Sequence, residues 1–192
     1  MKIGIFGGTF DPMTQAHLAI ACEASKKLDT VFIVPTTCDY YKQDRKLFSF
    51  DERVQIIRKM ISGCEGDIRI DTVEKDKNSK WRTIDTVEYF KRKYPNDELF
   101  LIIGKDSYEY FTTWYRFDDI LNVAELMVVE RNKTNGYKEG IEKPQNFERI
   151  PYTSLTIDGK LANCSATKVR EKLVEELLDL YLSDTGWYSN EA

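Results

Sequence analysis

The sequence predicts an α/β fold, a single Rossmann-like domain with a mostly parallel five- or six-stranded sheet and helices on both faces. One observation is that its strand-like segments, such as 30–35 (TVFIVP) and 99–103 (LFLII), are continuous apolar runs, typical of strands buried on both faces. The other is that these runs alternate with segments of helical periodicity, as parallel crossovers require. No linker or composition shift divides the 192 residues, so we expect 1–192 to form one domain.

Strand and helix patterns alternate from the first residues onward. Residues 2–6 form an apolar run that leads into the turn-forming segment GGTFDP. Residues 15–28 have helical spacing, and 30–35 is the second strand. Residues 36–48 have no period and are expected to form a loop. One side of the 15–28 helix is expected to carry Leu18, Ala21, Cys22, Ser25 and Leu28.

The second helix is expected to begin after Ser49, because Ser49 and Glu52 match a capping box. Its apolar stripe comprises Val54, Ile57 and Ile61. A third helix over 83–94 is stopped by Pro95 and turns Ile84, Val87 and Phe90 inward. The remaining expected elements are strands at 68–72, 99–103 and 126–130, a charged loop at 73–80, a surface loop at 132–147 and a final helix at about 166–181.

Composition excludes several classes of protein. The chain has 28 basic and 32 acidic side chains, a net charge of −4, which argues against a general nucleic-acid coat protein. No apolar stretch approaches the length of a membrane span, and the N-terminus does not resemble a secretion signal. The four cysteines form no C-x-x-C pair and there is one histidine, so we expect reduced thiols, a cytoplasmic location and no protein-bound metal.

Four segments with reactive or binding side chains follow predicted strands or precede the last helix. In open parallel sheets, ligands bind outside the carboxyl ends of the strands, so these segments should meet at one rim. They are 7–17 (GGTFDPMTQAH), 39–42 (DYYK), 104–110 (GKDSYEY) and 164–170 (CSATKVR).

The first segment combines tandem glycines with a helix start. Gly7 and Gly8 would let backbone N–H groups approach a phosphate closely. Thr14 and His17, three residues apart at the opening of a helix, would share one face. The alternative, a plain glycine turn followed by a helix-start histidine, is equally compatible with these residues.

The other segments carry cations, a carboxylate and an aromatic ring. Lys168 and Arg170 follow the expected N-cap Ser165, where positive charge opposes the helix dipole by about 0.3–1 kcal/mol each unless an anion binds. Lys42 lies in a basic loop that could close over phosphates, or is simply solvated. Asp106 could accept hydrogen bonds from ribose hydroxyls or cap a helix. Trp114 could stack on the ring of a ligand or belong to the core.

Together these segments resemble the nucleotidylyltransferase family with the signature [HT]-x-G-H. The family start GG[ST]FDP matches 7–12, and [HT]-x-G-H falls on 14–17 with Ala16 in place of glycine. The late element S-S-T-x-[IV]-R falls on 164–170, where Ser165, Thr167 and Arg170 match in role.

The middle of the chain most resembles the nicotinate/nicotinamide mononucleotide adenylyltransferases. TIDTV at 83–87 is similar to that branch's T-x-x-T-[LV] helix start. IIGKDS, Trp114 and VVER ending at Arg131 are similar to its IIG-x-D-S…W…V-x-R run. Lys42 lies in DYYK, where the branch usually has PPHK, a second departure after Ala16.

The resemblance implies adenylyl transfer from ATP to nicotinate mononucleotide, giving the deamido-NAD dinucleotide and pyrophosphate. Mg²⁺ would be carried on the phosphates. ATP and a pyridine mononucleotide would be the partners, without nucleic acid or membrane, and a homo-oligomer is left open. Two alternatives also stay open. One is another adenylyl- or cytidylyltransferase of this fold, such as a phosphopantetheine adenylyltransferase. The other is a non-catalytic nucleotide sensor, which the replacement of the signature glycine by Ala16 keeps open.

The resemblance also implies roles for individual residues. His17 would donate to the α-phosphate with support from Thr14, while Lys42 and Arg170 would hold the outer phosphates. Thr83, Trp114 and Arg131 would hold the mononucleotide. The ATP side would further include Gly7, Gly8, Thr9, Phe10, Gly104, Asp106, Ser165 and Thr167.

Overall fold

The computed structural model describes residues 1–37, 47–77, 81–130, 150–158 and 166–185. Within them, six strands form one parallel sheet in the order β3-β2-β1-β4-β5-β6, which confirms the predicted fold class. The strands are β1 (Lys2–Gly8), β2 (Thr30–Pro35), β3 (Ile68–Ile70), β4 (Glu98–Gly104), β5 (Glu125–Glu130) and β6 (Thr153–Thr156).

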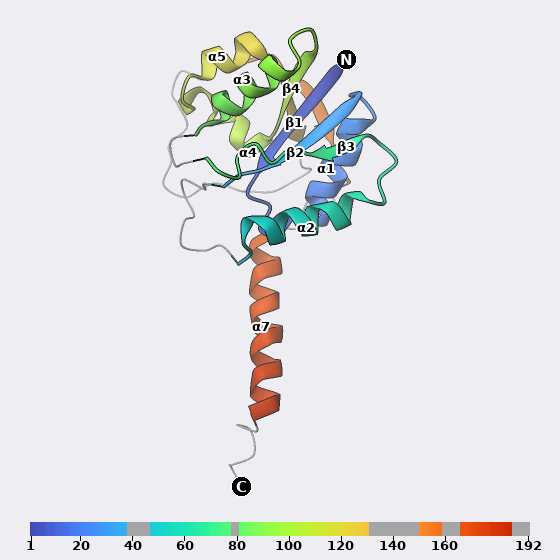
Figure 1. Cartoon of the computed structure of the whole chain (residues 1–192), viewed down its shortest axis with the longest axis vertical. Coiled ribbons are helices and arrows are strands. Elements are labelled where there is room, and N and C mark those ends of the chain that lie inside the picture. The colour runs from blue at the N-terminus through green and yellow to red at the C-terminus, as the bar shows by residue number, and fades with distance from the viewer. Residues whose placement is uncertain (38–46, 78–80, 131–149, 159–165, 186–192) are drawn as a thin grey trace.

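Helices cover both faces of the sheet (Figure 1). α1 (Gln15–Ser25) and α2 (Phe50–Ile61) lie on one face, and α3 (Thr83–Lys93) and α5 (Phe117–Val123) on the other. α7 (Ala166–Thr185) begins near α2 and extends away from the sheet (Figure 1). Two short elements, α4 (Lys105–Tyr108) and η1 (Phe111–Thr113), follow β4.

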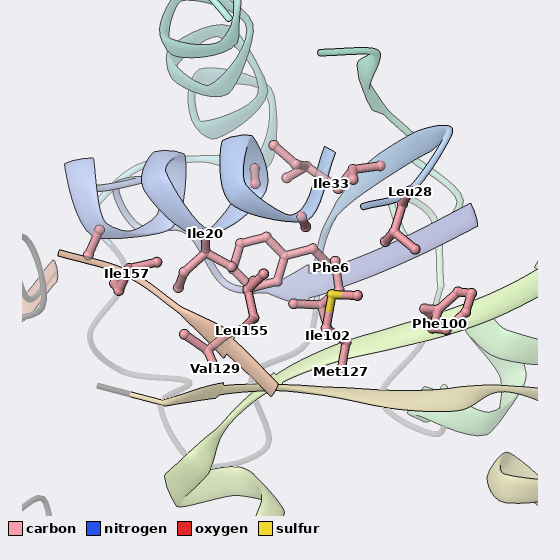
Figure 2. Packing of buried hydrophobic residues seen from close by; sticks show 14 of the residues in the cluster. Phe6, Ile20, Leu28, Ile33, Phe100, Ile102, Met127, Val129, Leu155 and Ile157 are labelled. Atoms are coloured by element: carbon pink, nitrogen blue, oxygen red, sulfur yellow. The ribbon is translucent and has the colours of Figure 1, made fainter. Parts of the chain in front are cut away.

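The core on the α1 face is a layer of apolar side chains between that helix and the sheet. Figure 2 shows Ile20 of α1 above Phe6, with Ile102 and Met127 from the neighbouring strands below them. Three of the four buried side chains of α1 are alanines, at positions 16, 21 and 24. A Cβ on Gly4 of β1 would lie 2.7 Å from Leu28 Cδ1, so glycine at this position leaves room for the loop residue that follows the helix.

Several sequence predictions are confirmed in detail. β2 has the predicted bounds, and Ser49 caps α2 with Glu52 as the second member of the capping box. Ile84, Val87 and Phe90 of α3 are fully buried, as the helical stripe predicts.

Other predictions are wrong. The buried face of α1 consists of Ala16, Ile20, Ala21 and Ala24, whereas Leu18, Cys22 and Ser25 are half-buried. The helix ends at Ser25, so Leu28 is buried from the loop rather than from the helix. The short elements α4, η1, α5 and β6 were not predicted; β6 has one buried side chain, Leu155, and its sequence therefore carries no apolar run.

Candidate active site at the carboxyl rim of the sheet

β1 ends in Gly7 and Gly8, at the rim where the sequence predicts a phosphate site. A Cβ on Gly8 would lie 3.0 Å from the ring of Phe10, so glycine allows that ring to fold back over the strand end. Phe10 adopts a left-handed φ of 48° and is 3% exposed. Its ring packs edge-on against His17, with centroids 5.2 Å apart, so Phe10 positions the histidine and can meet a nucleotide through its backbone.

Thr14 and His17 form a reciprocal cap at the start of α1. The backbone N–H of Thr14 donates to His17 Nδ1 at 3.0 Å, while Thr14 Oγ1 accepts the backbone N–H of His17 at 3.4 Å. Because Nδ1 accepts this hydrogen bond, it carries no proton, and the neutral ring carries its proton on Nε2. The cap thus makes His17 Nε2 a hydrogen-bond donor beside the glycine turn, as the predicted role requires.

Asp11 ties three segments together and was not predicted as a site residue. Its carboxylate is 4% exposed and accepts the N–H groups of Leu47 and Phe48, each at 2.9 Å. Arg170 of α7 donates to the Asp11 carbonyl, and its Nη1 lies 3.9 Å from Asp11 Oδ2. Arg170 also donates to Thr167 Oγ1 at 3.1 Å. The structure therefore brings the first turns of α7 to the turn that follows β1, as predicted.

Arg53 of α2 is the second residue that sequence reasoning missed. It is 1% exposed, and its guanidinium donates through Nη1 to the carbonyls of Thr9, at 2.5 Å, and Thr36, at 3.0 Å. These carbonyls follow β1 and β2, so one buried cation joins the two strand ends. Within the described residues its Nε has no hydrogen-bond partner. Burial lowers the pKa of Arg53, while the Asp11 charge acts in the opposite direction.

The end of β4 carries the predicted ribose-binding pair. Gly104 is both the last residue of β4 and the N-cap of α4. A Cβ on Gly104 would lie 2.5 Å from Asp106 Oδ1, so the exposed Asp106 carboxylate folds back over the strand end. Next to it, Lys105 donates to Tyr152 Oη at 2.9 Å, and that hydroxyl donates to Glu130 at 2.9 Å.

The predicted mononucleotide residues lie on the opposite face, around α3 and η1. Thr83 is the first residue of α3. Trp114 directly follows η1 and packs against Phe111, with ring centroids 5.2 Å apart. Arg116 pairs with Glu88 of α3 at 3.0 Å and so joins the two segments. Lys42, Arg131 and Ser165 lie outside the described residues, so their predicted roles stay predictions.

A buried hydrogen-bond chain lies beneath the start of α3. Trp81 Nε1 donates to Thr86 Oγ1 at 2.8 Å, and Thr86 donates to Glu74 Oε1 at 2.6 Å. Burial raises the pKa of Glu74 to about 7; the Thr86 hydrogen bond lowers it and the nearby Asp85 raises it. Glu74 is thus a titratable carboxyl close to the predicted mononucleotide site.

Comparison with known proteins identifies the family of this chain. The family model described as cytidylyltransferase-like matches residues 5–172. The chain belongs to this cytidylyltransferase-like family. It is 30% identical to the nicotinate-nucleotide adenylyltransferase of Bacillus subtilis (strain 168), over 98% of this chain and 99% of that protein. It is 31% identical to a probable nicotinate-nucleotide adenylyltransferase of Bacillus pumilus, over 91% and 87% of the two chains.

Solved structures agree on the fold of this cytidylyltransferase-like protein. Nicotinic acid mononucleotide adenylyltransferase of Plasmodium falciparum, complexed with NaAD, superposes with a TM-score of 0.67. That comparison covers 88% of this chain and 82% of the Plasmodium chain at 18% sequence identity. Among the described helices of this family member, none is long and apolar enough to cross a membrane.

The titration of Glu74 predicts a pH-dependent stability in this cytidylyltransferase-like protein. A carboxyl whose folded-state pKa is raised contributes stability below its ordinary pKa of 4.5, and loses it as pH rises through about 7. Glu74→Gln stays neutral and can still accept from Thr86. We expect its Tm to exceed that of the parent by about 2 °C or more at pH 8, and the difference to be small at pH 5.

Differential scanning calorimetry at both pH values tests this expectation. Asp76→Asn is the matched control, because Asp76 is exposed in the same turn, and its Tm difference should not change with pH. A Glu74→Gln protein that is less stable than the parent at pH 8 would contradict the prediction.

Proposed function

We propose that this protein transfers the adenylyl group of ATP to nicotinate mononucleotide, releasing pyrophosphate and forming the deamido-NAD dinucleotide. The observation that carries the proposal is the cap in which the Thr14 N–H occupies His17 Nδ1 and leaves the ring proton on Nε2, next to the glycine turn. The near full-length similarity to nicotinate-nucleotide adenylyltransferases supports the choice of acceptor.

The chemistry needs alignment and charge stabilisation more than a base. A phosphomonoester has a second pKa of about 6, so the attacking phosphate oxygen is already anionic at neutral pH. His17 would donate from Nε2 to an α-phosphate oxygen as negative charge grows there. Arg170, held at the same turn through Asp11, would bind the outer phosphates, and Lys42 is proposed to assist it.

Magnesium enters the proposal as part of the substrate, Mg-ATP. The described residues contain no cluster of three or more histidine, cysteine or carboxylate ligands. The Asp11 carboxylate accepts two backbone N–H groups, which leaves it poorly suited as a ligand. Mg²⁺ commonly binds through substrate phosphates with one or two carboxylates. The exposed carboxylate of Asp106 at this rim would be a candidate ligand.

We expect nicotinate mononucleotide to be preferred over its amide by about ten- to a hundredfold in kcat/KM, because hydrogen bonds to charged groups contribute about 1.5–3 kcal/mol. The N–H groups of Thr83 and Ile84 open α3 and have no intrahelical acceptor, which favours a carboxylate at that helix start. Asp85 opposes this preference by its charge, although its Oδ2 is engaged by the Arg82 N–H at 2.7 Å.

Pyrophosphate release with saturating Mg-ATP and each mononucleotide measures this ratio directly. Phosphopantetheine and CTP belong in the same panel. Equal kcat/KM for acid and amide would contradict the role of the α3 start. Turnover with phosphopantetheine instead, or ATP binding without turnover, would overturn the proposed function in favour of a related transferase or a sensor.

A further inference from the structure

Two cysteines far apart in the sequence meet where the end of α1 faces the turn after α2. Cys22 lies in the last turns of α1 and Cys64 follows the end of α2. Their Sγ atoms are 2.8 Å apart, and both residues are half-buried. We propose that Cys22 and Cys64 form a reversible oxidation site, at which a small-molecule disulfide converts the two thiols into an intramolecular disulfide.

The backbone, rather than side-chain freedom, brings the two sulfurs together. The turn after α2 approaches α1 so closely that a Cβ on Gly66 would lie 2.0 Å from Ser25 Oγ. Ser25 is itself fixed, because its hydroxyl donates to the Cys22 carbonyl at 2.9 Å. Cys64 is held by a hydrogen bond from its N–H to the Ile61 carbonyl at 3.1 Å. Packing between α1 and the turn after α2 therefore already holds the two cysteines side by side.

A disulfide accounts for this pair better than a metal does. The described residues contain no group of three or more histidine, cysteine or acidic side chains, and a thiolate zinc site uses four ligands. The Sγ separation of 2.8 Å exceeds the covalent S–S length of about 2.05 Å by less than 1 Å. The two sulfur atoms therefore need to approach each other by less than 1 Å for the bond to form.

The exchange balances with oxidised glutathione as the reactant. One cysteine thiolate attacks a glutathione sulfur, forms a mixed disulfide and releases one glutathione thiolate. The second cysteine thiolate attacks the protein sulfur of that mixed disulfide and releases the second glutathione. Two protein thiols lose two electrons and two protons, and one glutathione disulfide becomes two glutathione thiols.

The surroundings of Cys22 disfavour its thiolate form at neutral pH. Burial raises the pKa of Cys22 to about 12, and the contact with Cys64 and the charge of Glu23 act in the same direction, while Lys26 opposes them. The charge of Glu65 also acts near this cluster, where it raises the pKa of Lys26. Because the thiolate is the attacking species, oxidation is expected to be faster at pH 8.5 than at pH 7.

The test treats the reduced full-length chain with oxidised glutathione at pH 8.5, blocks remaining thiols with N-ethylmaleimide and maps tryptic peptides without reduction. The four cysteines fall on different tryptic peptides, and the proposal requires 3–26 to be linked to 60–69. The linked protein should have lost two hydrogen atoms, recover its thiols with dithiothreitol and melt about 5 °C or more above the reduced form, because the cross-link closes a long loop.

Variants separate this site from other thiol chemistry. Cys22→Ser and Cys64→Ser should each abolish both the link and the gain in Tm, whereas Cys38→Ser, the matched control, should keep both. Glutathione adducts without the link, a link through Cys38 or Cys164, or a link that forms without raising Tm would each overturn the proposal.

Discussion

Replacing His17 with alanine is expected to lower kcat for adenylyl transfer by about 10²–10³-fold, because it removes a donor to charge that grows in the transition state. The variant should fold, since the helix start loses only the hydrogen bond that the Thr14 N–H donates to the His17 ring. A loss of about 0.5–2 kcal/mol of stability is the expected size of that cap effect.

Asparagine at this position separates the cap from the chemistry. His17→Asn offers a carbonyl oxygen to the Thr14 N–H but does not reach as far as Nε2, so we expect it to regain Tm without regaining kcat. Gln15→Ala, on the exposed side of the same helical turn, is the control and should match the parent in both. A His17→Ala protein within threefold of the parent kcat would show that His17 is not the donor.

Replacing Arg53 is expected to have the largest effect on stability. Arg53→Ala removes a side chain that is 1% exposed and leaves the carbonyls of Thr9 and Thr36 without their donor. A cost of about 2–4 kcal/mol follows for lost charged hydrogen bonds and the cavity, which corresponds to a fall in Tm of about 5–15 °C. The KM for ATP should rise as well, because Thr9 lies in the turn after β1 that is proposed to bind the phosphates of ATP.

Thermal unfolding of three variants checks the cause of this effect. Arg58→Ala, an exposed position on the same helix that contacts Gln55 at 3.2 Å, should shift Tm by about 1 °C at most. Arg53→Met keeps the apolar stem and loses both hydrogen bonds, so it should remain well below the parent. If Arg53→Met melts with the parent, the hydrogen bonds to the strand ends do not stabilise the fold.

Some residues of the candidate site could be predicted from the sequence, whereas others became apparent only in the structure. The pair Thr14 and His17 could be placed from spacing at a helix start, and Gly104 and Asp106 from their position after an apolar run. Asp11 and Arg53 could not, because a single aspartate in a turn and a single arginine in a helix have many ordinary uses on a surface. Their roles depend on backbone groups at Leu47 and Thr36, which no local pattern links to them.

Local patterns in the sequence suffice to predict the fold class and most of the interior elements. The strand at Thr30–Pro35 and the helix beginning at Thr83 are specified by local side-chain patterns, since a strand buried on both faces must be apolar throughout and an amphipathic helix must repeat every three to four residues. The capping box at Ser49 is equally local.

Tertiary contacts set three features that the sequence did not predict: the edge strand Thr153–Thr156, the true inner face of α1 and the meeting of Cys22 with Cys64. An edge strand with one buried side chain has no apolar run that would predict it. The strand Thr153–Thr156 forms by pairing with β5. The face of α1 is set by packing against several strands of the sheet, and three of its four buried side chains are alanines. Such contacts join residues distant in the chain, so their energies are absent from any local sequence pattern.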